Sequence, residues 1–289
     1  MTTSKWFEEA NEKTGIKFGL ALEAKLHEEQ SPYQKLEIYQ TKTFGNLMVI
    51  DDCIMLTQRD NFLYHEMISH PALLSHPHPK KVLIIGGGDC GTLREVLKHP
   101  SVTEAVQCDI DERVTRLAEK YFPELCESNN DPRAQLVFKD GVEWVQNQAD
   151  ESIDVVIIDS TDPVGFAEAL FGPEFLSECY RILSPTGVLV QQSESPFLHA
   201  DSWMGDLLNV LKDVGFDTIQ PLSFPQPVYP SGWWSVTLAG KGLDVRLFRD
   251  TDSEDISETT QYYNAEIHQA ALAIPQFLKS KVKTVAQDY

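Results

Sequence analysis

Residues 82–99 read VLIIGGGDCGTLREVLKH. The order of an apolar run, three glycines and an amphipathic segment predicts a buried strand, a sharp turn and a helix. Gly86, Gly87, Gly88 and Gly91 let the backbone turn tightly and approach a ligand at the carboxyl end of the strand. The stretch therefore indicates the first unit of a nucleoside-binding α/β domain, with a purely structural turn as the alternative.

Similar apolar runs follow and alternate with amphipathic segments such as ERVTRLAEKYF at 112–122. The runs occupy residues 105–110, 135–138, 153–159 and 187–192. Continuous apolar strands separated by helices are what a parallel sheet covered on both faces requires. We predict an α/β fold with a doubly wound, mostly parallel sheet.

The first part of the chain has a different pattern. Residues 18–58 are rich in strand-forming runs, including KLEIYQT at 35–41 and NLMVID at 46–51. A helical segment at 62–74 and a proline-rich connector at 75–80 come next. We therefore expect a small β-rich domain with a connecting helix at 1–78 and a Rossmann-like α/β domain at 79–289. The acidic segment at 250–258 is expected to be a solvated loop.

Composition narrows the classes of partner. The 289 residues carry 24 Lys and Arg against 44 Asp and Glu, a formal net charge of −20. Such a surface repels phosphate backbones and anionic lipid, so we expect neither a nucleic-acid nor a membrane partner. The five cysteines form no CxxC pair, and charged residues interrupt any apolar run in the first thirty residues. We expect a cytoplasmic protein with reduced thiols.

Polar residues at three strand ends indicate a nucleoside site. Asp109 ends the second parallel strand, where a carboxylate accepts hydrogen bonds from ribose hydroxyls. Asp89 puts a negative charge where a pyrophosphate would lie, which argues against NAD and favours a nucleoside with a positive charge. Asp140 and Gly141 follow the third strand, where they either hold an adenine amino group or form a simple turn. Together these strand ends are typical of the S-adenosylmethionine-dependent methyltransferase type of fold.

A second group of acids follows the fourth strand, in the order Asp159, Ser160, Thr161, Asp162. With Asp89 beside them, the cleft would hold three carboxylates without an evident Arg or Lys partner. Such a cluster is costly unless a cation fills it or one acid is protonated. Capping of a turn is the structural alternative for Asp162.

Five motifs then appear in a recognisable order. They are SPYQ (31–34), YHEM (64–67), GGGDCGTLREVLKH (86–99), DSTDP (159–163) and VYPSGWW (228–234). The chain resembles the polyamine aminopropyltransferases, and most of all the spermidine synthases, over essentially its whole length. The resemblance implies transfer of an aminopropyl group from decarboxylated S-adenosylmethionine to putrescine, which releases methylthioadenosine and spermidine. It also implies a homodimer or homotetramer, with no prosthetic group and no metal.

The resemblance assigns roles to individual residues. It implies that nucleoside contacts come from Gln34, Asp109, Asp140 and Gly141, and the glycine turn adds Gly86 and Gly88. Polyamine contacts are implied for His65, Asp89, Asp159, Ser160, Thr161 and Asp162, and an amine channel lined by Tyr64 and Tyr229. Asp159 matches the proton acceptor. A packed helix histidine and a core aromatic are the structural alternatives for His65 and Tyr229.

Three positions depart from the family pattern. Asp109 stands where many relatives carry Glu, and Cys90 replaces a glycine that often follows GGGD. Phe166 stands where bacterial relatives have a proline that meets the adenine, which puts that contact in question.

The implied chemistry fits the residue types. A sulfonium leaves as a neutral thioether, so neither a metal nor a general acid is needed. The attacking amine must lose a proton, which a carboxylate such as Asp159 can accept, with Tyr64 assisting. His70, His76 and His78 near the connector are expected to be incidental. The rival hypotheses are a methyltransferase, which would not need the acidic cleft, and an inactive polyamine- or nucleoside-binding protein.

Overall fold

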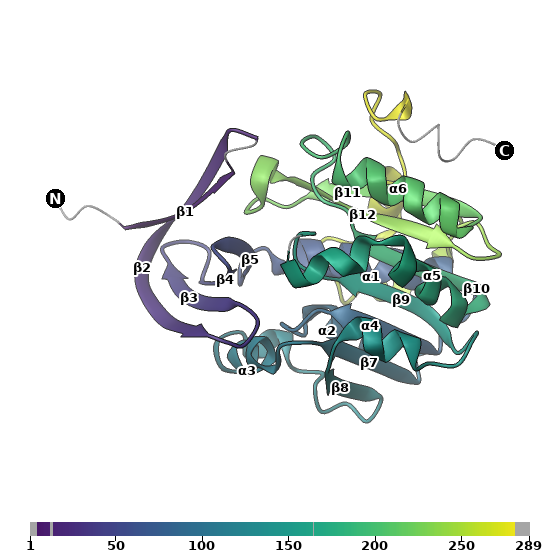
Figure 1. Ribbon diagram of the computed structural model, residues 1–289, viewed down its shortest axis with the longest axis horizontal. Coiled ribbons are helices and arrows are strands. Elements are labelled where there is room, and N and C mark those ends of the chain that lie inside the picture. Colours follow the sequence, from purple (N-terminus) through teal and green to yellow (C-terminus); the bar gives the residue numbers. More distant parts are fainter. Residues whose placement is uncertain (1–4, 12–13, 164, 281–289) are drawn as a thin grey trace.

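A computed structural model describes residues 5–11, 14–163 and 165–280. Two sheets account for its strands (Figure 1). Within the described residues, the first is a five-stranded antiparallel meander in the order β1-β2-β3-β4-β5. Its strands are β1 (Trp6–Asn11), β2 (Ile16–Gln30), β3 (Lys35–Thr41), β4 (Asn46–Ile50) and β5 (Cys53–Thr57).

The second sheet forms the larger part of the molecule and has the order β11-β12-β10-β9-β6-β7-β8 over the described residues. Neighbours from β10 to β8 are parallel, and β12 is antiparallel to both of its neighbours. The strands are β6 (Lys81–Gly86), β7 (Glu104–Asp109), β8 (Ala134–Phe138), β9 (Ile153–Asp159), β10 (Leu183–Gln192), β11 (Thr218–Pro225) and β12 (Trp233–Gly240). The predicted fold class is confirmed.

Helices cover both faces of this sheet because alternate side chains of its strands point to opposite faces. Val82 and Ile84 of β6 join the apolar cluster that includes α1 and α2, whereas Leu83 and Ile85 join the cluster that includes α5 and α6. The helices are α1 (Asn61–Ser75), α2 (Gly91–Leu97), α3 (Glu112–Tyr121), α4 (Gly141–Gln146), α5 (Pro173–Ile182), α6 (Trp203–Val214), α7 (Asp250–Ser257) and α8 (Ala265–Ala271). Short 3-10 turns lie at η1 (Pro123–Leu125), η2 (Gly165–Phe171) and η3 (Pro230–Gly232).

Helix α3 joins the two sheets. Its apolar face, with Val114 and Leu117, packs against Leu36 and Ile38 of β3 and Met48 of β4. The five-stranded sheet therefore lies beside the larger sheet and contacts it through α3, as Figure 1 shows. The position of the domain boundary, at 78/79, stays a prediction.

Two expectations about polar segments are wrong. The acidic segment expected to be a loop forms α7, because Ser253 and Ile256 are buried and Ser253 lies 3.3 Å from the Tyr263 hydroxyl. His70 is not an incidental connector residue. It is buried within α1, with Nδ1 2.9 Å from His99 Nε2 and Nε2 3.1 Å from Glu95.

Candidate active site

The glycine turn lies at the point where the order of the parallel strands reverses. Strand β6 pairs with β7 on one side and with β9 on the other, which is the usual ligand position in such sheets. Gly86 has φ +81°, and a Cβ there would lie 2.1 Å from the carbonyl oxygen of Asp159. Only glycine fits, so the turn can bring its backbone against the end of β9.

A cavity of about 210 Å³ opens at this edge and is bounded by both sheets. Met48 and Met55 contribute from the five-stranded sheet, and Ile85 and Cys108 from the larger one. Its lining contains most of the residues singled out in the sequence: Gln34, Tyr64, His65, Gly86, Gly88, Asp89, Asp109, Asp140, Gly141, Asp159, Ser160, Thr161 and Tyr229. Asp162 lies in a second, smaller cavity that shares Tyr64, Ser160, Thr161 and Tyr229 with the first.

Asp109 ends β7 and faces Gly88 across the cavity floor. A Cβ on Gly88 would lie 2.7 Å from Asp109 Oδ2, so glycine makes room for this carboxylate. The other oxygen accepts a hydrogen bond from the Asp111 N–H at 2.8 Å. Burial raises the pKa of Asp109 to about 7. Gln34 lies close by, donating to Asp111 Oδ2 at 3.1 Å.

Asp140 has a structural task that the sequence left open. Its side chain caps α4, accepting hydrogen bonds from the N–H groups of Val142 at 2.8 Å and Glu143 at 3.4 Å. Asp140 is exposed and, with Gly141, still lines the cavity. The turn that was the alternative for Asp140 is therefore present as a helix cap, and contact of Asp140 with an adenine stays a prediction.

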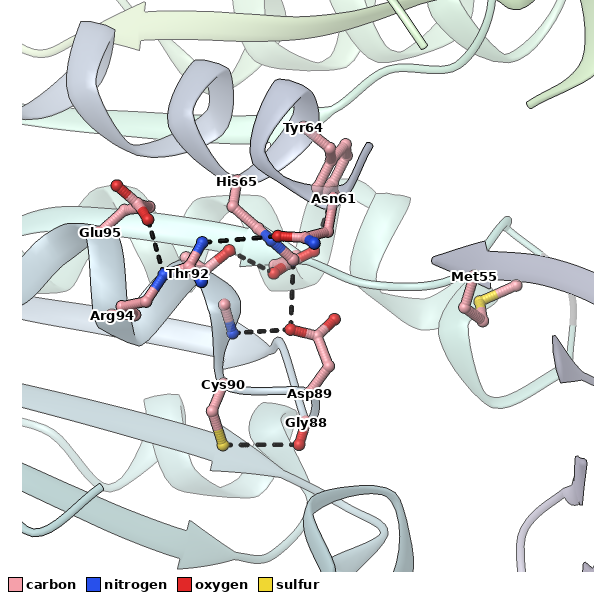
Figure 2. A network of polar contacts seen from close by, with 12 residues as sticks. Met55, Asn61, Tyr64, His65, Gly88, Asp89, Cys90, Thr92, Arg94 and Glu95 are labelled. Carbon is pink, nitrogen blue, oxygen red and sulfur yellow. Dashed lines mark hydrogen bonds and ion pairs between the residues drawn. The ribbon is translucent and has the colours of Figure 1, made fainter. Parts of the chain in front are cut away.

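Asp89 has a partner that the sequence did not indicate. His65 Nε2, from α1, lies 3.1 Å from Asp89 Oδ1, and the Gly91 N–H donates to the same oxygen at 2.7 Å (Figure 2). Burial opposes ionisation of Asp89, but the His65 charge and these hydrogen bonds lower the pKa of Asp89 overall. Burial likewise opposes a charged His65, but Asp89 raises the pKa of His65 above its ordinary value. The pair is an ion pair at the cavity wall.

Asp159, at the end of β9, binds one hydroxyl on each oxygen. Tyr64 donates to Oδ1 at 2.7 Å, and Thr92 donates to Oδ2 at 2.6 Å. Burial raises the pKa of Asp159, and the nearby charge of Asp89 raises it further. Thr92 was missed because its sequence position only indicates the first turn of α2.

Tyr229 lines both cavities. Its hydroxyl donates to the carbonyl of Met55, in β5, at 2.5 Å. Its ring contacts Tyr64, with centroids 6.1 Å apart, and Trp234, with centroids 4.7 Å apart. Tyr229 and Tyr64 thus form a pair of aromatic rings that lines both cavities, and their role in an amine channel stays a prediction.

The second cavity, of about 60 Å³, is acidic. Glu9 of β1, Glu194 after β10 and Asp162 line it together with His199. Burial raises the pKa of Glu9 and of Glu194 to about 7 each. Burial, together with the neighbouring Glu194, raises the pKa of Asp162 well above its usual range. Sequence reasoning found Asp162 but missed both glutamates, because they come from distant elements.

The structure shows the contacts of two of the three residues that depart from the family pattern, Cys90 and Asp109. Cys90 has φ +70°, a backbone conformation that favours glycine, and its buried thiol lies 3.6 Å from the Gly88 carbonyl. Asp109 reaches the cavity despite its shorter side chain. The side chain of Phe166 lies outside the described part of the structure.

The described residues contain no group of three or more His, Cys, Asp or Glu arranged to hold a metal ion. In the same part of the chain, no helix combines the length and apolar character needed to cross a membrane.

Comparison with known proteins identifies the class. Residues 61–249 match the spermine/spermidine synthase domain, and residues 5–58 match the spermidine synthase tetramerisation domain. The chain belongs to the polyamine aminopropyltransferase family. It is 59% identical over 277 residues to the polyamine aminopropyltransferase of Thioalkalivibrio sulfidiphilus, covering 96% of this chain and 97% of the relative. It is 55% identical over 274 residues to that of Halorhodospira halophila, covering 95% of this chain and 99% of the relative.

Solved structures agree with this assignment. A spermidine synthase in complex with the transition-state analogue AdoDATO superposes with a TM-score of 0.92 at 36% identity, covering 98% of each chain. The spermidine synthase of Thermotoga maritima gives a TM-score of 0.90 at 35% identity, covering 98% of this chain and 97% of the other.

Proposed function

We propose that this protein transfers the aminopropyl group of decarboxylated S-adenosylmethionine to putrescine, giving spermidine and methylthioadenosine, with Asp159 as the proton acceptor. One observation carries the proposal. The Asp159 carboxylate accepts a hydrogen bond from Tyr64, whose side chain lines both the large cavity and the small acidic one. A group between a nucleoside-sized cavity and an acidic cavity suits a reaction that joins a nucleoside to a cationic amine.

The large cavity supports the nucleoside part of the proposal. Its Asp109 carboxylate would accept hydrogen bonds from the ribose hydroxyls, with Gly86 and Gly88 giving close backbone approach. Asp140 and Gly141 would contact the adenine, and Gln34 would complete the nucleoside end. AdoDATO bound to the similar spermidine synthase is a transition-state analogue, which supports this reaction class for the present chain.

The acidic groups support the amine part. Asp89, held in place by His65, would meet the ammonium tail of the nucleoside and the near end of the amine, between the rings of Tyr64 and Tyr229. The far ammonium of the diamine would lie in the second cavity, near Ser160, Thr161, Asp162 and the two glutamates Glu9 and Glu194. Holding that far end fixes which nitrogen reaches the reacting carbon.

The reaction then needs little beyond orientation and one proton transfer. The amine lone pair attacks the methylene carbon next to the sulfonium from about 3–3.5 Å, in line with the breaking C–S bond. The electron pair of that bond stays on sulfur, which leaves as a neutral thioether. Asp159 takes the proton from the attacking nitrogen.

The proposal also covers the oligomeric state and the cellular location of the protein. The match to a tetramerisation domain over residues 5–58 supports a homodimer or homotetramer. All five cysteines are free thiols, which suits the reducing cytoplasm.

The test is a reaction with separated substrates. The purified protein is incubated with decarboxylated S-adenosylmethionine and, in turn, putrescine, cadaverine and spermidine, and the products are identified by mass spectrometry. We expect spermidine and methylthioadenosine with putrescine as the preferred acceptor. A parallel incubation with S-adenosylmethionine that yields a methylated amine would overturn the proposal in favour of a methyltransferase.

A further inference from the structure

The two oxygens of Asp159 have different surroundings. Oδ1 accepts the Tyr64 hydroxyl at 2.7 Å, and Tyr64 faces the cavities. Oδ2 accepts the Thr92 hydroxyl at 2.6 Å, and Thr92 is fully buried in the first turn of α2. Figure 2 shows Thr92 on the helix that follows the glycine turn and Tyr64 on α1 above it. The carboxylate is therefore held from two sides by two helices.

The glycine turn lies close to Oδ2. The position that a Cβ on Gly87 would occupy is 3.0 Å from Asp159 Oδ2, so this oxygen faces the turn as well as the Thr92 hydroxyl. Oδ1 lies beside Tyr64, which lines both cavities. An amine in these cavities would therefore approach Oδ1.

We propose that Thr92 is a positioning residue for the proton transfer: its hydroxyl holds Asp159 Oδ2 against α2 and leaves Oδ1, beside Tyr64, to take the proton from the amine. The inference rests on the proposed function, since it takes Asp159 to be the proton acceptor. Thr92 itself touches neither the amine nor the nucleoside.

The charges around Asp159 determine how much the hydrogen bond from Thr92 affects its ionisation. The ionisable groups that face Asp159 are Tyr64 and His65 from α1, Asp89 from the glycine turn, Asp109 from β7 and Tyr229 beside η3. Burial and the Asp89 charge favour the protonated form of Asp159, which cannot accept a proton. The two hydroxyl donors favour the ionised form, so loss of the Thr92 hydroxyl shifts the balance towards protonation.

Three variants separate this role from a structural one. Thr92→Val keeps the shape and removes the hydroxyl, whereas Thr92→Ser keeps the hydroxyl. Thr115→Val is the matched control, because Thr115 is also fully buried and donates to the same turn, at Gly88 O over 2.8 Å. It makes no hydrogen bond to Asp159.

The readouts are kcat against pH at saturating substrates and the Kd of methylthioadenosine. We expect Thr92→Val to lower kcat at pH 7 by about ten- to a hundredfold, the effect of one lost hydrogen bond to a charged group. The acidic limb of the kcat profile should move up by about one to two pH units, with the Kd within about twofold of the wild type. Thr92→Ser should restore both the rate and the limb, and Thr115→Val should leave the limb in place.

An acidic limb that does not move in Thr92→Val, or that moves equally in Thr115→Val, would overturn the inference. Asp159→Asn separates this failure from failure of the proposed function. If Asp159→Asn retains near-normal turnover, the proton acceptor is wrong and the role of Thr92 falls with it. If Asp159→Asn is inactive and the limb of Thr92→Val is unmoved, only the role of Thr92 is wrong. In the Asp159→Asn background, adding Thr92→Val should produce no further loss.

Discussion

His65 closes over Gly91, so that a Cβ on Gly91 would lie 2.2 Å from His65 Cε1. The same ring places Nε2 3.1 Å from Asp89 Oδ1, the oxygen that also accepts the Gly91 N–H at 2.7 Å. The absence of a side chain at Gly91 is thus what lets a histidine from α1 reach the carboxylate of the glycine turn. Gly91 thus allows His65 of the YHEM motif to contact Asp89 of the GGGDCG motif.

Gly91→Ala should therefore displace the His65 ring and weaken its contact with Asp89. Alanine suits a helix better than glycine by up to about 1 kcal/mol, so any loss of stability must come from the clash. We expect unfolding to become easier by about 1–3 kcal/mol, as for other overpacked sites. Gly172→Ala is the control, since its Cβ would have its nearest neighbours at 3.5 Å. Urea titration of both variants checks this, and an unchanged Gly91→Ala midpoint would contradict it.

Asp89 should determine which form of the nucleoside co-substrate binds. Decarboxylated S-adenosylmethionine ends in an ammonium, whereas S-adenosylmethionine adds a carboxylate beside it. Two like charges about 4 Å apart repel by about 4 kcal/mol at an effective dielectric of about 20, and both solvent relaxation and the paired charge of His65 reduce this repulsion. We expect the wild type to bind the decarboxylated form at least about tenfold more tightly.

Asp89→Asn should narrow that ratio, mainly by weakening binding of the decarboxylated form. Competitive titration of both ligands measures it, with Asp162→Asn as the control, because Asp162 lines the other cavity. Equal affinities in the wild type would favour a methyltransferase. A ratio that survives in Asp89→Asn would remove this residue as the discriminator.

Nucleoside binding should depend on pH through Asp109. Its carboxyl has a pKa of about 7 in the free protein because it is buried, and only the ionised form can accept hydrogen bonds on both oxygens. We expect the Kd of methylthioadenosine to fall as the pH rises from 6 to 8. Asp109→Ala should bind about 1.5–3 kcal/mol more weakly at pH 8 and lose this pH dependence. Calorimetry at several pH values decides, and an unchanged Kd in the variant would place the ribose elsewhere.

The second cavity should release protons when a diamine binds. Glu9 and Glu194 have pKa values of about 7, so each is partly protonated at neutral pH. An ammonium beside them favours their charged forms, and protons leave as the amine enters. Titration of putrescine into the methylthioadenosine complex, in buffers of different ionisation enthalpy, should show net release near pH 7. Glu194→Gln should reduce the release and raise the KM for putrescine, and equal heats in all buffers would contradict this.

The strands that position the site were predictable because burial on both faces leaves a clear pattern. The apolar run at 153–159 coincides with β9, Ile153–Asp159, and its last residue stands at the ligand edge of the sheet. Asp89 and Asp109 were placed at the same edge because they come at or just after the ends of parallel strands. The acidic helix α7 was not predictable, because two buried residues, Ser253 and Ile256, are too few to give a helical period.

Contacts between distant elements account for what the sequence could not indicate. Thr92 lies in the first turn of α2, and the helical pattern of the sequence does not indicate that its hydroxyl bonds to Asp159. Glu9 and Glu194 come from a strand of the small sheet and the end of β10, and only the packing of the two sheets brings them into one cavity. His65 was found as a family position, whereas its ion pair with Asp89 depended on the bare backbone of Gly91.

Asp109 should also lower the stability of the free protein at high pH. Its pKa rises from 3.8 to about 7 on folding, so the folded state holds this proton more tightly than the unfolded state does. Between about pH 4 and pH 7 the unfolded state binds fewer protons, and this group makes the folded protein less stable as the pH rises. Above pH 7 the full cost is present, at most about 4 kcal/mol.

Asp109→Asn removes the charge and keeps the size of the side chain. The variant should unfold at a higher urea concentration than the wild type at pH 8, whereas at pH 4 the two should be nearly equal. Asp140→Asn is the control, because Asp140 is exposed and carries no burial cost. Saturating methylthioadenosine should remove the advantage of Asp109→Asn, since the ribose would stabilise the ionised carboxylate only in the wild type. An Asp109→Asn midpoint that exceeds the wild type equally at both pH values would show that burial of this charge is not the cause.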